Sequence, residues 1–241
     1  MPVLTELTDG ANRLGLELDS RQLEQFEIYY HELVSWNQKT NLTAITDYKS
    51  VQIKHFLDSL TIAPALPHPF PTELRLLDVG AGAGFPGLPL KILRPQIRLV
   101  LLEATGKKVA FLEHIVSALK LTGVEVLAQR AEEAAHTSEY RAHFDIVTSR
   151  AVAELPALLE LTLPFCRPGG QVIAQKKGDI RTELDRASRA LEILGGQLTE
   201  TKEVNLPLFV DSRCLVVVTK AAPTPDTYPR RPGIPVKRPL I

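Results

Sequence analysis

The chain has 241 residues, of which 44% are hydrophobic, enough to bury one substantial core or a core with a small appended domain. Basic and acidic residues balance at 28 each, so no whole-molecule field attracts nucleic acid or a membrane, and any basic surface has to be local. Two cysteines, Cys166 and Cys214, stand far apart without metal-ligand spacing, and no apolar run is long enough to span a bilayer or to serve as a signal peptide. We therefore expect a cytoplasmic, globular protein without a metal site or a membrane partner.

The first third of the chain has helical periodicity. Residues 20–38 carry apolar side chains at three- and four-residue intervals, which predicts an amphipathic helix with Ser20 as its N-terminal cap. Residues 51–66 show a second helical face, and the proline-rich stretch 64–73 ends the pattern. These features predict an N-terminal helical extension over residues 1–67.

The pattern then changes to short apolar runs that alternate with helical segments. The predicted strands cover residues 75–79, 97–104, 124–130, 144–151, 171–176, 198–204 and 213–220. Strands separated by helices form βαβ units, so the sheet should be mostly parallel, and apolar runs without alternation belong to strands covered on both faces. The last two strands have no helix between them and should form an antiparallel pair at the sheet edge. We therefore predict an α/β domain with a seven-stranded sheet over residues 68–220.

The last 21 residues, 221–241, are rich in proline and in basic side chains. Proline removes backbone donors and holds the chain extended, so this segment should form a tail without a core of its own.

A glycine-rich loop follows the first predicted strand, in the stretch "LLDVGAGAGFPGLPLKIL". Gly80, Gly82 and Gly84 stand where an open parallel sheet binds ligands, at the carboxyl end of a strand and before a helix. Glycine permits positive φ and close approach of the backbone to a ligand, and a helix N-terminus offers unpaired N–H groups. The loop therefore predicts a ligand rather than a simple turn.

Two ligands compete for this loop. Gly82, Gly84 and Gly87 spell the dinucleotide fingerprint, and Glu103 lies at about the right distance to bind a ribose hydroxyl, as in a nicotinamide-dependent oxidoreductase. Asp78 before the loop, Pro86 within the pattern and the antiparallel final pair argue against a dinucleotide fold. An acid at Asp78 is suited instead to the ammonium of an amino-acid-like ligand.

Motifs across nearly the whole chain resemble one family. "LLDVGAGAGFPGLPL" resembles motif I of Rossmann-like, class I S-adenosylmethionine-dependent methyltransferases. Together with "LVSWNQKTNLTAI", "KHFLDSL", "GKKVAFLEHI", "TSRAVAEL" and "YPRRPGIPVKRPL", it resembles the glucose-inhibited division protein B family. These are bacterial methyltransferases that modify N7 of one guanosine in 16S ribosomal RNA, nucleotide 527 in the conventional 16S numbering.

The resemblance implies a cofactor site for S-adenosylmethionine. Asp78 would lie near the ammonium, Glu103 would accept the two ribose hydroxyls, and Ala131 and Glu132 would line the adenine edge. The implied cofactor-binding residues are Asp78, Gly80, Gly82, Gly84, Phe85, Glu103, Ala104, Thr105, Ala131, Glu132 and Arg150. Two simpler interpretations stay open, because Glu103 could be a solvated surface acid and Glu132 could merely favour a helix dipole.

The chain shows no obvious catalytic acid, base or nucleophile. After the fourth strand, "TSRAVAEL" stands where methyltransferases of exocyclic amines typically carry a polar-Pro-Pro-aromatic motif, and Cys166 lies away from the predicted strand tips. A neutral guanine N7 attacks through its own in-plane lone pair, so we expect no general base and a mechanism of positioning and desolvation.

An RNA substrate requires local basic surface. The predicted RNA-binding residues are Lys107, Lys108, Lys176, Lys177, Arg230, Arg231, Lys237 and Arg238, and the partner would be 16S rRNA or the small ribosomal subunit. His55 would either contact the ligand or be a hydrogen-bonded structural histidine. No feature argues for an oligomer, so a monomer is expected. The competing functions are a nicotinamide-dependent oxidoreductase and a non-catalytic RNA- or ribosome-binding module.

Overall fold

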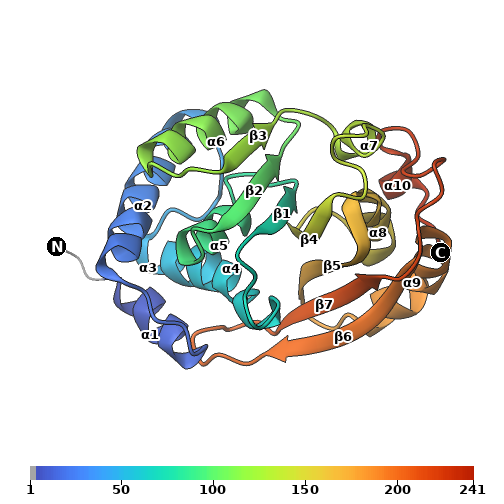
Figure 1. The fold of residues 1–241 in the computed structure, drawn as a ribbon. Coiled ribbons are helices and arrows are strands. Elements are labelled where there is room, and N and C mark those ends of the chain that lie inside the picture. The colour runs from blue at the N-terminus through green and yellow to red at the C-terminus, as the bar shows by residue number, and fades with distance from the viewer. Residues whose placement is uncertain (1–3) are drawn as a thin grey trace.

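The computed structural model describes residues 4–241 and contains one seven-stranded sheet (Figure 1). Its strands are β1 (Leu74–Val79), β2 (Ile97–Leu102), β3 (Val124–Leu127), β4 (Phe144–Arg150), β5 (Cys166–Lys177), β6 (Gly196–Val204) and β7 (Arg213–Lys220). The spatial order is β3-β2-β1-β4-β5-β7-β6, and β1 to β5 pair in parallel. Strand β7 runs antiparallel to both β5 and β6, so the predicted sheet and its antiparallel edge pair are confirmed.

Helices cover both faces of the sheet, which explains the uninterrupted apolar strands. Leu76 packs into a core with the N-terminal helices, α5 (Gly87–Leu93) and α6 (Gly106–Ala118). Its neighbour Leu77 points to the opposite core, formed with α7 (Ala131–Ala134), α8 (Leu155–Thr162) and α9 (Arg181–Leu194). Successive strand residues therefore face different cores, and both must be apolar.

The N-terminal helices share the first of these cores with the sheet. They are α1 (Thr5–Arg13), α2 (Ser20–Thr40), α3 (Tyr48–Val51), the π-helix η1 (Gln52–Leu57), α4 (Asp58–Leu60) and the short 3₁₀ helix η2 (Ala63–Ala65). Phe26 and Phe56 are fully buried in the same cluster as sheet residues. No helix among residues 4–241 is long and apolar enough to cross a membrane.

The N-terminal cap of α2 differs from the predicted one. Asp19, and not Ser20, is the cap: its carboxylate accepts from the Gln22 backbone N–H at 2.8 Å, and the Gln22 side chain accepts from the Asp19 N–H at 2.9 Å. The Gln22 side chain also donates to the carbonyls of Ile92 and Leu93 at the end of α5. This reciprocal pair satisfies two backbone donors, which a serine cap one residue later would not do.

The tail, residues 221–241, lies against α7 and α8 (Figure 1). Arg230 forms a bidentate ion pair with Glu160 of α8, with a shortest separation of 2.6 Å, and the Gly233 N–H donates to the Glu132 carboxylate at 2.8 Å. The tail contains the short helix α10 (Ile234–Lys237), and Leu240 is buried in the second core. The segment is thus ordered by packing on the rest of the chain, because the buried carboxylates of Glu132 and Glu160 require donors.

Candidate functional site

The glycine loop between β1 and α5 has a backbone conformation that is unfavourable for residues other than glycine. Gly80, Gly82 and Gly84 have φ of +71°, +60° and +93°. A Cβ atom on Gly80 would lie 2.6 Å from a methyl group of Val152, and one on Gly84 would lie 2.6 Å from the Tyr29 hydroxyl oxygen. Both the dihedral angles and the space therefore require glycine at Gly80 and Gly84.

The N-terminal extension holds this loop in place. Tyr29 of α2 is fully buried and donates its hydroxyl to the Ala83 carbonyl at 2.5 Å. Its ring stacks on Phe85 with centroids 5.2 Å apart, and burial raises the pKa of the Tyr29 phenol well above its usual range. The hydroxyl therefore remains a donor at every physiological pH, and α2 shapes the loop directly.

Asp78 supports the loop from behind. Its side chain is fully buried, and one carboxylate oxygen accepts from the Gly87 N–H, the first residue of α5, at 2.8 Å. The other oxygen has no partner among residues 4–241, and burial raises the pKa of Asp78 to about 7. Asp78 thus joins the end of β1 to the start of α5 and does not line the cavity in front of the loop.

Glu103, at the end of β2, faces the glycine loop. Its two carboxylate oxygens accept from the Gly82 N–H at 3.0 Å and from the Thr105 N–H at 2.8 Å, and Lys108 lies 4.0 Å away. The side chain is only 7% exposed, which argues against a solvated surface acid. Ala104 and Thr105 are exposed beside it, where α6 begins.

A cavity of about 340 Å³ lies in front of the loop, within the size range of small-molecule sites. Among the predicted site residues, it is lined by Gly80, Gly82, Phe85, Glu103, Lys108 and Arg150. His55, which the sequence suggested as one possible ligand contact, lines it as well, and the structure adds Leu42, Thr43, Ala81, Ala83, Ala151 and Val152. Ala131 and Glu132 do not line it, and the Glu132 carboxylate is engaged by Gly233 of the tail.

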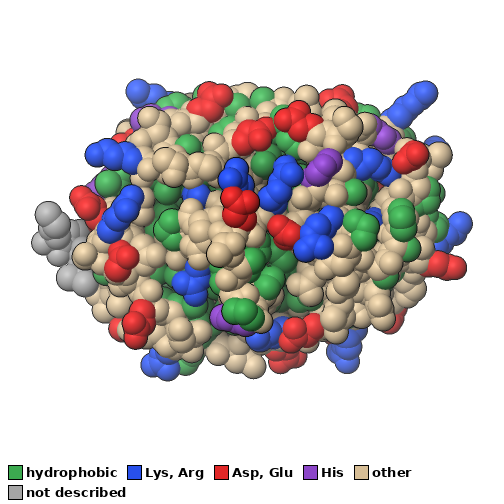
Figure 2. All heavy atoms as spheres, viewed as in Figure 1, with side chains coloured by type: hydrophobic (Ala, Val, Ile, Leu, Met, Phe, Trp, Pro, Cys, Tyr) green, Lys and Arg blue, Asp and Glu red, His purple; other side chains and the backbone are tan. Residues whose placement is uncertain are grey.

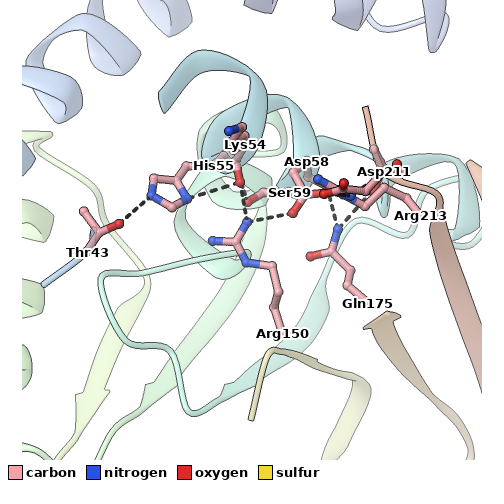
Figure 3. A network of polar contacts seen from close by, with 10 residues as sticks. Thr43, Lys54, His55, Asp58, Ser59, Arg150, Gln175, Asp211 and Arg213 are labelled. Atoms are coloured by element: carbon pink, nitrogen blue, oxygen red, sulfur yellow. Dashed lines mark hydrogen bonds and ion pairs between the residues drawn. The ribbon is translucent and has the colours of Figure 1, made fainter. Parts of the chain in front are cut away.

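His55 and Phe85 form one wall of this cavity. The His55 ring stacks on Phe85 with centroids 4.6 Å apart, and its two nitrogens lie 2.9 Å from the Thr43 hydroxyl and 3.2 Å from the Lys54 carbonyl (Figure 3). Burial, and then the nearby Arg150 charge, lowers the pKa of His55 to about 4. His55 is therefore neutral at pH 7, and both ring nitrogens already have partners.

A buried aspartate positions the arginine at the end of β4. Asp58 accepts from Arg150 at 3.0 Å with one oxygen and from Arg213 of β7 at 2.8 Å with the other (Figure 3). The same Arg150 nitrogen donates to the Lys54 carbonyl at 3.2 Å, and the guanidinium carbon lies 5.0 Å from the centre of the Phe85 ring. These contacts fix the Arg150 guanidinium at the edge of the cavity.

Sequence reasoning did not single out Asp58, Gln175 or Arg213. A sequence pattern could have indicated Asp58, because it follows His55 by three residues within an apolar helical segment. This spacing puts both polar side chains on one face of the helix. Arg213 is 155 residues from Asp58, so no local pattern could have joined them.

The predicted RNA-binding residues differ in how free their charges are. Lys176 is paired with Glu183 at 2.6 Å, and Arg230 is paired with Glu160, an interaction that raises the pKa of Arg230. The remaining side chains are exposed or half-buried, namely Lys107, Lys108, Lys177, Arg231, Lys237 and Arg238. On the face shown in Figure 2, basic and acidic side chains are interspersed and form no continuous positive patch.

The strand order, the antiparallel β7 and the glycine loop after β1 define the class I S-adenosylmethionine-dependent methyltransferase fold. A solved structure of this fold is the ribosomal protein L11 methylase from Lactobacillus delbrueckii subsp. bulgaricus, with a TM-score of 0.51 and 15% sequence identity. The match covers 74% of this chain and 81% of that one. At this identity the likeness concerns the fold alone.

Residues 22–211 match the family model GidB, described as rRNA small subunit methyltransferase G. The curated "Ribosomal RNA small subunit methyltransferase G" of Dehalococcoides mccartyi is 55% identical over 99% of this chain and 100% of its own length. The protein of the same name from Roseiflexus castenholzii is 49% identical over the same shares. The chain therefore belongs to the rRNA small subunit methyltransferase G family, and the predicted family resemblance is confirmed.

The neutral, buried His55 predicts a specific acid sensitivity. Its pKa is about 4 in the folded protein, against about 6.5 in the unfolded chain, so its contribution to stability is present above pH 6.5 and is lost as the pH falls towards 4. Between pH 7 and pH 4.5, the free energy of unfolding measured with urea should fall by about 2 kcal/mol more in the wild type than in His55→Gln. The raised pKa of Asp78 acts in the opposite direction but is common to both proteins.

The exposed His143 provides the matched control. His143→Gln should follow the wild-type pH dependence. Parallel losses of stability in the wild type and His55→Gln would contradict the assignment of a neutral His55.

Proposed function

We propose that this protein transfers the methyl group of S-adenosylmethionine to N7 of one guanosine in 16S rRNA. The observation that carries the proposal is the cavity at the carboxyl ends of β1, β2 and β4. The glycine loop, Glu103 and Arg150 meet there, in a chain of the rRNA small subunit methyltransferase G family. By the family resemblance, the modified guanosine is nucleotide 527.

The residues of this cavity fit the cofactor. Glu103 supplies a nearly buried carboxylate, which accepts hydrogen bonds from vicinal ribose hydroxyls. Gly80 and Gly82 present bare backbone to the cavity, so the methionine portion can approach the end of β1 closely. Phe85 and Arg150 also line the cavity. When bound, the cofactor supplies an electrophilic methyl group on its sulfonium.

The chain's own contribution to the reaction is positioning and exclusion of water. His55 is neutral, and both of its ring nitrogens already have hydrogen-bond partners, so it is not free to act as a general base. A guanine N7 needs no proton removed before it attacks. The barrier is then lowered by holding N7 in line with the methyl group in a dry site.

The substrate is 16S rRNA or the small ribosomal subunit, and we place the protein in the cytoplasm as a monomer. The exposed or half-buried cations of α6, the end of β5 and the tail are the proposed RNA contacts: Lys107, Lys108, Lys177, Arg231, Lys237 and Arg238. Ala131 and Glu132 remain the proposed adenine edge, with Glu132 shared between the cofactor site and the tail.

Methyl transfer is tested directly. Purified protein is incubated with labelled S-adenosylmethionine and either small subunits or 16S RNA that lacks the modification. Chemical cleavage at 7-methylguanosine should then produce one new scission, at a single guanosine. If neither substrate accepts a methyl group, the enzyme assignment fails and a non-catalytic RNA- or ribosome-binding module remains.

The cofactor is tested by calorimetry. S-adenosylhomocysteine should bind and NAD should not, whereas binding of NAD alone would favour the oxidoreductase. Glu103→Gln should weaken S-adenosylhomocysteine binding about 10-fold, because a hydrogen bond to a charged acceptor is replaced by a neutral one. Glu113→Gln, an exposed acid on α6, is the control and should bind as the wild type does.

The tail is tested by the salt dependence of RNA binding. Arg230 is committed to Glu160, so the triple variant replaces Arg231, Lys237 and Arg238 with glutamine. Loss of three phosphate contacts should reduce the log–log slope by about 2, at about 0.7 per contact on single-stranded RNA.

A triple variant of exposed cations at the amino-terminal side of the sheet, Arg21, Arg98 and Lys120, should keep the wild-type slope. An unchanged slope in the tail variant would remove the tail from the RNA contact surface.

A further inference from the structure

A second cavity, of about 200 Å³, adjoins the cofactor cavity. It lies at the carboxyl ends of β4 and β5, beside the first residues of β7. Its lining residues include Asp58, Ala153, Gln175, Lys176, Lys177 and Arg213. Arg150 and Ala151 line both cavities, so the two spaces meet at the end of β4. We call this space the β4–β5 cavity.

One wall of the β4–β5 cavity carries a buried acceptor without a partner. Gln175 is 8% exposed, and its amide nitrogen donates to the Asp58 carbonyl at 2.6 Å and to the Thr61 hydroxyl at 3.0 Å. Because a carbonyl only accepts, these contacts fix which end of the amide is the NH₂ group. The Gln175 Oε1 atom has no hydrogen-bond partner among residues 4–241.

The direction of this acceptor is visible in Figure 3. The Gln175 amide nitrogen points to Asp58, and Oε1 points to the side on which Arg150 lies. A buried acceptor that is held rigidly and left unpaired favours a ligand that brings a donor to that place.

Charge and size narrow the chemistry of that ligand. The lining includes four cations, Arg150, Lys176, Lys177 and Arg213, against two acids, Asp58 and Glu183. This excess of positive charge suits a nucleotide, whose phosphates are anionic. The cavity volume of about 200 Å³ is smaller than the range of about 300–1,000 Å³ that is typical of sites for drug-sized ligands. A cavity of this size suits one planar base.

We propose that the β4–β5 cavity binds the target guanine base and that Gln175 Oε1 accepts a hydrogen bond from its N1–H or N2–H group. This inference rests on the proposed function. N2 lies at the end of the guanine ring system farthest from N7, so a base held by Gln175 directs N7 towards the cofactor cavity. Adenine carries an unprotonated N1 instead, which would set two acceptors against each other.

The test compares variants across matched substrates. 16S RNA is assembled by ligation with guanosine, inosine or 1-methylguanosine at the modified position; inosine lacks N2–H and 1-methylguanosine lacks N1–H. The wild type should lose about 10- to 100-fold in kcat/KM on at least one analogue, as expected for one buried hydrogen bond. Gln175→Leu should methylate the guanosine RNA no faster than the wild type methylates that analogue. The ratio of kcat/KM on guanosine RNA to kcat/KM on the analogue RNA should therefore fall to about 1 in this variant.

Two controls separate base reading from structural damage. Gln171→Leu changes the same residue type four positions earlier on β5, at a residue that does not line the cavity, and should keep the wild-type ratio. Calorimetry with S-adenosylhomocysteine should give the same affinity for Gln175→Leu and the wild type. If Gln175→Leu does not fold, Gln175→Met, which keeps the length of the side chain, takes its place.

The outcomes distinguish this inference from the function on which it rests. A wild type that methylates no guanosine defeats the proposed function itself. A wild type that methylates guanosine and both analogues equally, or a Gln175→Leu variant that keeps the wild-type ratio, overturns the role of Gln175 and leaves the methyltransferase function intact.

Discussion

The buried carboxylate of Asp58 is the contact on which the site depends. It is 3% exposed and lies between two arginines from distant parts of the chain, Arg150 at the end of β4 and Arg213 at the start of β7. A carboxylate taken out of water must be paired, and loss of one partner of such a cluster costs about 3–5 kcal/mol. Asp58 therefore ties the N-terminal extension to the parallel and the antiparallel halves of the sheet.

The geometry of both cavities follows from this cluster. Asp58 holds the Arg150 guanidinium over the Phe85 ring, and Phe85 in turn stacks with His55 and with Tyr29. Tyr29 binds the glycine loop through the Ala83 carbonyl. The cavity in front of the glycine loop and the β4–β5 cavity meet at Arg150, which Asp58 of the N-terminal helices holds in place. His55 lines the first cavity and Asp58 lines the second, so these helices contribute to both cavities besides covering the sheet.

Sequence patterns correctly predicted the features of the fold that depend on residues close together in the chain. The unalternating apolar strands, the helices between them and the helix-free final pair were enough to predict the sheet, since βαβ connections have one preferred hand. The glycine loop was predictable as well, because Gly80 and Gly84 have positive φ and no room for a side chain, so the residue type itself marks the turn. Glu103 is nearly buried against the loop, as a functional carboxylate at that place would be.

Sequence patterns did not predict which side chains pair with one another in the folded protein. The sequence suggested that Asp78 contacts an ammonium group, yet its carboxylate is fully buried and accepts a hydrogen bond from the Gly87 N–H. Arg230 lies in a basic tail, where a phosphate contact was expected, but it forms an ion pair with Glu160, 70 residues away in the sequence. The sequence by itself determined the fold class, the family and the position of the glycine loop, because these depend on periodicity and short motifs. Only the tertiary structure decided which basic side chains are paired, that Asp58 fixes Arg150, and that the Gln175 Oε1 atom has no partner within residues 4–241. Burial and pairing depend on residues that meet only when the chain folds.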